Sequence, residues 1–167
     1  VYAESGSHII VDGDVEGAQG VYARGISEIT RVEVIGNVTA SSSSNDDAAI
    51  KADVDAEVII LGDVISKNCK FADAHYGATI RIDGEIDSNM SIVKVGGATK
   101  DRTNDMTEPT TLEGYYTYSE GVTSIWVKQK IPGEDLEEPT WPGDSRPWAS
   151  STSTSLMVYW PKALDNI

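Results

Sequence analysis

The sequence is poor in the residues that build disulfides and most metal sites. Its 167 residues include one cysteine, Cys69, and two histidines, His8 and His75. A single cysteine excludes an internal disulfide, and we interpret Cys69 as a small apolar filler beside Phe71 rather than as a reactive thiol. One cysteine and two histidines without a fixed spacing are too few for a zinc site.

Long apolar runs and basic residues are also scarce. No run approaches the ~20 apolar residues of a membrane span, and the chain has neither a signal peptide nor an initiator methionine, so we expect a segment of a larger protein. The formal net charge is −14, from 27 acidic and 13 basic residues. Such a surface repels nucleic acid and anionic membranes, and leaves cationic partners, divalent ions and neutral ligands such as glycans.

What the first half does contain is a nine-residue frame that occurs four times. The copies are IIVDGDVEG (9–17), VEVIGNVTA (32–40), VIILGDVIS (58–66) and IRIDGEIDS (80–88). Each copy has apolar residues at positions 1, 3 and 7, glycine at position 5 and Asp, Asn or Glu at position 6. The glycines are Gly13, Gly36, Gly62 and Gly84, spaced 23, 26 and 22 residues apart. A period near 22 residues with short β elements is typical of a parallel β-solenoid.

The alternation within the frame predicts which side chains stack inside such a solenoid. Positions 1, 3 and 7 point inward and form columns, because successive strand residues face opposite sides. We expect the glycine to form a corner between two strands, in a backbone conformation that β-branched residues resist. A second, weaker strand-like element follows each frame, at 20–28, 48–56, 69–77 and 90–98. The alternative of four independent hairpins explains the glycines but not the matching residues on both sides of them.

The composition changes near residue 100. All six prolines and all four tryptophans lie beyond it. We therefore predict an all-β fold with two parts: a short right-handed parallel β-helix of about four coils in residues 1–100, and a β-rich cap or small module in residues 101–167. Trp126 and Trp160 lie in strand-like runs, and we expect both in the core.

The frame and its partner element resemble the parallel β-helix repeats of large bacterial surface and secreted proteins, which are pectin-lyase-like in the broad sense. The resemblance covers residues 9–95, a little over half of the chain. It implies an adhesin, stalk or spacer, or less often a glycan-processing enzyme. The abundance of Ser, Thr, Asp and Gly agrees with an extracellular or cell-surface location.

The position after each glycine is the first candidate site. It presents Asp14, Asn37, Asp63 and Glu85 on the outer surface of adjacent coils. Asp63 and Glu85 form the only adjacent acidic pair and could bind Ca²⁺ weakly or serve acid–base chemistry. Corners also favour Asp and Asn for local hydrogen bonding alone, which is the interpretation that we prefer. No other cofactor is expected.

Exposed tryptophans in a proline-rich loop, residues 132–148, are the second candidate site. Trp141 and Trp148 could stack on sugar rings. No G-x-S-x-G, P-loop or G-x-G-x-x-G motif occurs. We therefore expect a non-catalytic structural or adhesive segment, with a glycan, a host or cell-surface protein and neighbouring domains as partners. A glycan-binding module or a glycan-active β-helix enzyme is the alternative.

Four outward positions are apolar where polar residues are expected. They are Ile35, Ile59, Leu61 and Ile65. Monomers seldom expose such a contiguous patch. We predict that the aromatic segment folds back over it, through residues 111–130 and 155–160, or that a second copy of the chain covers it.

Overall fold

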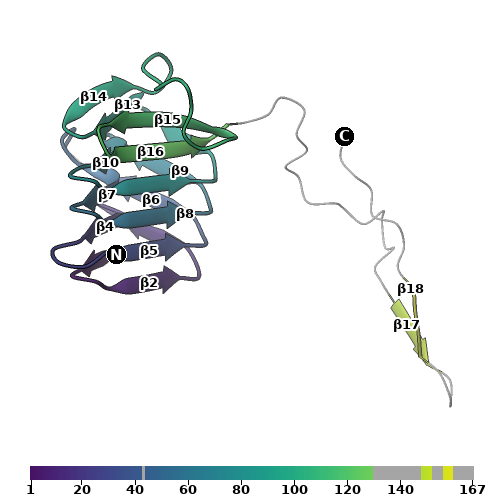
Figure 1. Cartoon of the computed structure of the whole chain (residues 1–167). Coiled ribbons are helices and arrows are strands. Elements are labelled where there is room, and N and C mark those ends of the chain that lie inside the picture. The colour runs from purple at the N-terminus through teal and green to yellow at the C-terminus, as the bar shows by residue number, and fades with distance from the viewer. Residues whose placement is uncertain (43, 130–147, 152–155, 160–167) are drawn as a thin grey trace. The chain divides into compact units, whose positions relative to one another are not determined.

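The chain forms a β-solenoid, described by a computed structural model over residues 1–42, 44–129, 148–151 and 156–159 (Figure 1). These residues contain eighteen strands and no helix, and hence no helix that could span a membrane. The contacts divide the chain into two compact units, Val1–Gln129 and Lys130–Ile167. The composition suggested a boundary near residue 100, but residues 101–129 make their contacts with the coils.

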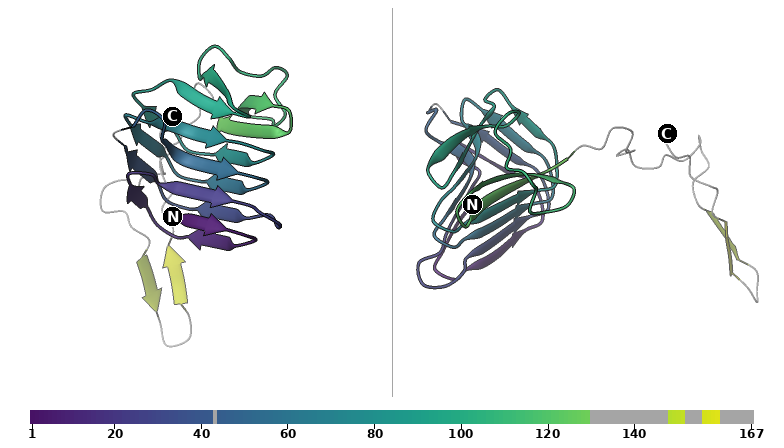
Figure 2. Two further views of the ribbon diagram at one scale, coloured as in Figure 1. Left: turned by 90° about the vertical axis from the view of Figure 1, so that its left-hand side faces the viewer. Right: turned by 45° about the horizontal axis from the view of Figure 1, so that its top comes forward.

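Each coil contributes one strand to each of three parallel sheets, A, B and C, whose stacked strands are seen from two further directions in Figure 2. Sheet A contains β1 (Tyr2–Glu4), β4 (Val21–Arg24), β7 (Ala48–Asp53), β10 (Lys70–Ala74), β13 (Ile92–Val95) and the antiparallel β14 (Ala98–Asp101). Sheet B contains β2 (His8–Val11), β5 (Arg31–Val34), β8 (Glu57–Ile60), β11 (Thr79–Ile82), β16 (Thr123–Lys128) and the antiparallel β15 (Tyr115–Glu120). Sheet C contains β3 (Val15–Gly17), β6 (Val38–Ser41), β9 (Val64–Lys67) and β12 (Ile86–Ser88). In the second unit β17 (Trp148–Ser151) pairs antiparallel with β18 (Leu156–Tyr159).

The register of the strands confirms the predicted inward columns. One column is Ile9, Val32, Val58, Ile80 and Ile125. The next is Val11, Val34, Ile60, Ile82 and Val127. The third, on sheet C, is Val15, Val38, Val64 and Ile86. The interior members are fully buried, and each such side chain contributes roughly 1.5–3 kcal/mol to the hydrophobic core. Cys69 is buried as a free thiol within this core, as expected.

The corner glycines lie in a column as predicted, but for a different physical reason. Of the four glycines of the frame, only Gly13 has a left-handed φ, +139°. At Gly36, Gly62 and Gly84 an added Cβ would lie 2.5, 2.5 and 2.2 Å from the carbonyl oxygen of the glycine one coil earlier. Glycine is required at these corners because successive backbones approach so closely there.

The end of the stack is closed by residues 96–128, drawn in green in Figure 1. Strand β16 adds a rung to sheet B beside β11, and β15 pairs with its far edge. In the loop between β14 and β15, hydrogen bonds from the Thr103 hydroxyl and backbone N–H lower the pKa of Asp101 to about 2. The Tyr118 hydroxyl donates to the Arg102 carbonyl at 2.6 Å, and burial raises the pKa of Tyr118 to about 12. Because β15 runs antiparallel to β16, this hairpin ends the parallel stack.

Because these strands extend sheet B edge to edge, the prediction that residues 111–130 cover the outer apolar patch is wrong. Ile35 and Leu61 remain exposed, whereas Ile59 is only 5% exposed. The register puts Glu33 and Arg81 on either side of Ile59, and the aliphatic stems of such side chains can bury an apolar neighbour.

The prediction that Trp126 lies in the core is also wrong. Trp126 is half-buried on the outer face of β16, and its Nε1 donates to Thr111 Oγ1 at 2.8 Å. The inward residues of this strand are its neighbours Ile125 and Val127. Trp160 lies outside the described residues.

Candidate functional site

The predicted acidic positions after the corner glycines form a hydrogen-bonded ladder along the solenoid. Asp14 Oδ1 accepts from Asn37 N at 2.7 Å, Asn37 Oδ1 accepts from Asp63 N at 2.8 Å, and Asp63 Oδ1 accepts from Glu85 N at 2.8 Å. Each side chain thus binds a backbone N–H on the next coil, 22 to 26 residues further along the chain. An Asp or Asn is required because its short side chain reaches this N–H with an acceptor oxygen.

Asp63 and Glu85 are brought together by this ladder, but Asp63 already uses one carboxylate oxygen on the backbone of Glu85. Throughout the described residues no group of three or more His, Cys, Asp and Glu side chains is arranged to hold a metal ion. A weak Ca²⁺ site at this pair stays a prediction, and the ladder has a structural role without it.

The corner between sheets A and B differs from the glycine corner. Here the chain turns through pairs of residues with left-handed φ, which are Ser5–Gly6, Val54–Asp55 and Tyr76–Gly77. Such turns favour glycine, asparagine and aspartate. Val54, with φ of +47°, and Tyr76, with φ of +50°, are bulky residues in a conformation that costs L-residues roughly 1–2 kcal/mol.

The second coil replaces the two-residue turn by a longer loop, residues 25–30. The loop is fixed at both ends. Gly25 packs so closely that a Cβ would lie 2.2 Å from the Val54 carbonyl oxygen. The buried Thr30 hydroxyl accepts from Gly6 N and donates to Arg24 O, both at 3.0 Å. Between these anchors the loop holds two exposed isoleucines, Ile26 at 54% and Ile29 at 69%.

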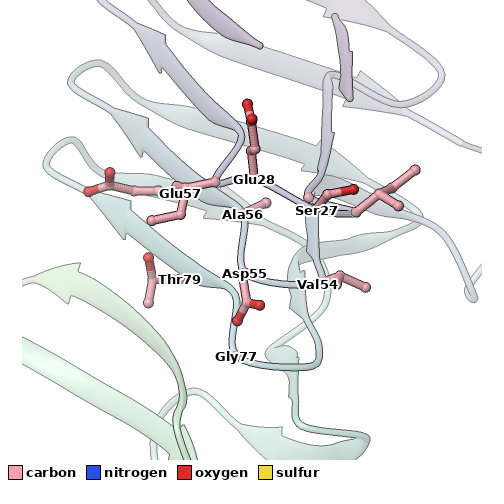
Figure 3. A pocket seen from close by; sticks show the side chains of 11 residues that line it. Ser27, Glu28, Val54, Asp55, Ala56, Glu57, Gly77 and Thr79 are labelled. Atoms are coloured by element: carbon pink, nitrogen blue, oxygen red, sulfur yellow. The ribbon is translucent and has the colours of Figure 1, made fainter. Parts of the chain in front are cut away.

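This loop and the turns of the next two coils line an open groove of about 540 Å³, which we call the corner groove (Figure 3). Its apolar lining includes Ile26, Ile29, Val54 and Ala56. Its charged lining residues are Glu28, Asp55 and Glu57, all acidic. A groove with apolar and acidic side chains can bind a ligand that combines a cation with an aliphatic group.

Two further exposed apolar side chains lie on the same row of corners toward the closed end. Tyr76 is 74% exposed and Val122, in the turn between β15 and β16, is 83% exposed. The two turns are neighbours, because Gly77 N donates to Thr123 Oγ1 at 2.9 Å. We call Ile26, Ile29, Tyr76 and Val122 the apolar edge.

The other residues singled out in the sequence do not join this groove. Trp141 lies outside the described residues, and Trp148 begins β17, for which only the backbone is described. His8 is exposed on β2. His75 Nε2 lies 2.6 Å from Asp73 Oδ1, and in the described part of the chain no hydroxyl or thiol hydrogen-bonds to this histidine. The glycan-stacking role of the two tryptophans stays a prediction.

Sequence reasoning missed the corner groove. One signal for it was present: residues 25–30 separate β4 from β5, whereas only residues 54–56 separate the equivalent strands one coil later. The extra residues include two isoleucines in a loop, where polar residues are the rule. Which coils face that loop cannot be deduced from its length.

Comparison of the chain with protein-family models, with curated proteins and with solved structures finds no match in any of the three.

Proposed function

We propose that the chain is a non-catalytic structural or adhesive segment of an extracellular bacterial surface protein. In this proposal the coils form a stiff body, and the apolar edge is its contact surface. The carrying observation is the set of exposed apolar side chains on one row of corners: Ile26 and Ile29 on the second coil, Tyr76 on the fourth and Val122 in the closing hairpin. Val54, at the corner of the third coil between them, is half-buried. Burial of each on a partner would contribute up to roughly 1.5–3 kcal/mol, and such clusters on a protein surface mark interaction sites.

The construction of the solenoid supports the structural half of the proposal. Three ladder side chains, Asp14, Asn37 and Asp63, cross-link successive coils, and the inward columns run without interruption from β2 to β16. Contacts between neighbouring coils are therefore repeated at every rung, which keeps side chains on the corners at a fixed spacing of about 4.8 Å per coil.

An adhesion assay with an edge variant and a control variant tests the proposal. The parent chain is coupled to beads, and retention is measured on cultured cells, on immobilised extracellular-matrix proteins and on a glycan array. The edge variant carries Ile26→Ser, Ile29→Ser, Tyr76→Asn and Val122→Thr. The control carries Ile10→Ser and Ile35→Ser, two exposed isoleucines away from the edge.

We expect the parent and the control to be retained and the edge variant to be released, with all three giving the same β-type circular dichroism spectrum. Equal retention of the edge variant and the parent would contradict the proposal. So would turnover of a polysaccharide that a single substitution at Asp63 or Glu85 abolishes, since that would establish the enzymatic alternative.

A further inference from the structure

We propose that the corner groove binds an extended polypeptide segment of a partner protein that carries lysine or arginine near an aliphatic side chain. This inference rests on the proposed adhesive function and names the chemistry of its partner. It starts from the charge of the groove. Arg31 Nη1 lies 3.4 Å from Glu57 Oε2, so one of the three carboxylates is already paired. Glu28 and Asp55 have no ion pair with any residue in the described ranges.

Both of these carboxylates lie where a neighbouring turn has no side chain. An added Cβ at Gly6 would lie 2.4 Å from Glu28 Oε2, and one at Gly77 would lie 2.5 Å from Asp55 Oδ1. Figure 3 shows Asp55 beside the turn of Gly77. Two carboxylates from different coils are thus held close to the backbone of adjacent turns. The two carboxylates point in opposite directions along the stack, Glu28 toward the first coil and Asp55 toward the fourth. A separate cationic side chain of an extended segment can therefore reach each of them beside the exposed Ile26 and Ile29.

Charge also decides which kind of occupant fits. A second copy of the chain would bring another net charge of −14 to an acidic groove, and nucleic acids and anionic membranes are likewise repelled. A basic polypeptide is attracted. It also supplies aliphatic side chains on the same face as its cations, because residues i and i+2 of an extended chain point the same way, about 6.6 Å apart.

The affinity should be modest and depend on salt. The carboxylates are open to solvent, where each ion pair adds little, and charges at this exposure are screened as the ionic strength rises. Removing both free carboxylates should weaken binding roughly five- to tenfold.

A titration followed by amide NMR of the full chain tests the inference. The probe is the blocked pentapeptide Lys-Thr-Leu-Thr-Lys, which presents two lysines and a leucine on one face when extended. Comparison peptides replace both lysines by glutamate or the leucine by serine. The groove variant is Glu28→Gln with Asp55→Asn. The charge-matched control is Glu16→Gln with Asp87→Asn, two exposed acidic residues on sheet C.

We expect shift changes confined to residues 25–29, 54–57 and 77–79. The groove variant should raise Kd roughly five- to tenfold, the control should leave Kd unchanged, and both comparison peptides should bind more weakly than the probe. Equal weakening in the control, binding of the glutamate peptide as tight as that of the probe, shift changes elsewhere, or no binding of the probe would overturn the inference. If the probe fails while the edge variant still loses adhesion, the proposed function stands and only this partner chemistry is refuted.

Discussion

Replacing Gly62 by alanine tests directly why glycine stands at the corners. The new Cβ would lie 2.5 Å from the Gly36 carbonyl oxygen, whereas real Cβ atoms essentially never come closer than 3.0 Å, so the two rungs must separate locally by at least 0.5 Å. The same corner carries the 2.8 Å hydrogen bond from Asp63 N to Asn37 Oδ1, which this shift strains. Overpacking typically costs 1–3 kcal/mol and a lost hydrogen bond roughly 0.5–1.5 kcal/mol. We therefore expect Gly62→Ala to lower the free energy of unfolding by about 2–4 kcal/mol.

Urea unfolding followed by circular dichroism provides the measurement, with two further glycines as references. Gly84→Ala should cost at least as much as Gly62→Ala, because its Cβ would lie 2.2 Å from the Gly62 oxygen. Gly114→Ala should cost only about 1 kcal/mol, because Gly114 has a φ of +79° but open space around it. If Gly62→Ala costs no more than Gly114→Ala, the corner glycines serve backbone conformation and the close-approach argument is refuted.

Four further predictions follow from the same structure. Asn37→Ala should lower the free energy of unfolding by about 1 kcal/mol at any salt concentration, because Asp63 N loses its acceptor. Asn37→Asp should be destabilising only at low salt, by about 0.8 kcal/mol for each carboxylate some 5 Å away. Urea titrations at two salt concentrations distinguish the two effects. Ile60→Asp should unfold the first unit, because it buries an unpaired charge in the central column, and the loss of its circular dichroism signal would report this. Val54→Asn should raise the unfolding midpoint by relieving a left-handed valine, a gain of about 1 kcal/mol. The pKa of Tyr118 is raised to about 12 in the folded state, against about 10 in the unfolded chain. The stability that this difference contributes is fully present below pH 10 and is lost as the pH rises from 10 to 12, by up to about 2.7 kcal/mol. Tyr118→Phe should flatten this part of the profile of urea midpoint against pH.

The sequence by itself determined the solenoid and the residues inside it. Four copies of one frame place apolar side chains at the same alternate positions, and a slip by one residue would turn them all outward. The only economical way to bury four such sets is to stack them in register, so Val32, Val58 and Ile80 had to share a column. The same alternation would also have placed Trp126 outside, since Ile125 and Val127 beside it are the inward residues.

Only the tertiary structure decided what happens between coils. The need for glycine at position 62 comes from the backbone of Gly36, and the partner of the Asn37 side chain is an N–H 26 residues away. The corner groove arises because a long loop of one coil lies against short turns of the next two. Residues 115–128 close the stack because β16 pairs with the free edge of β11 and β15 pairs with β16. These contacts depend on the distances between neighbouring coils, which the residues of one coil do not determine alone. The local sequence pattern therefore predicted the strands but not the site.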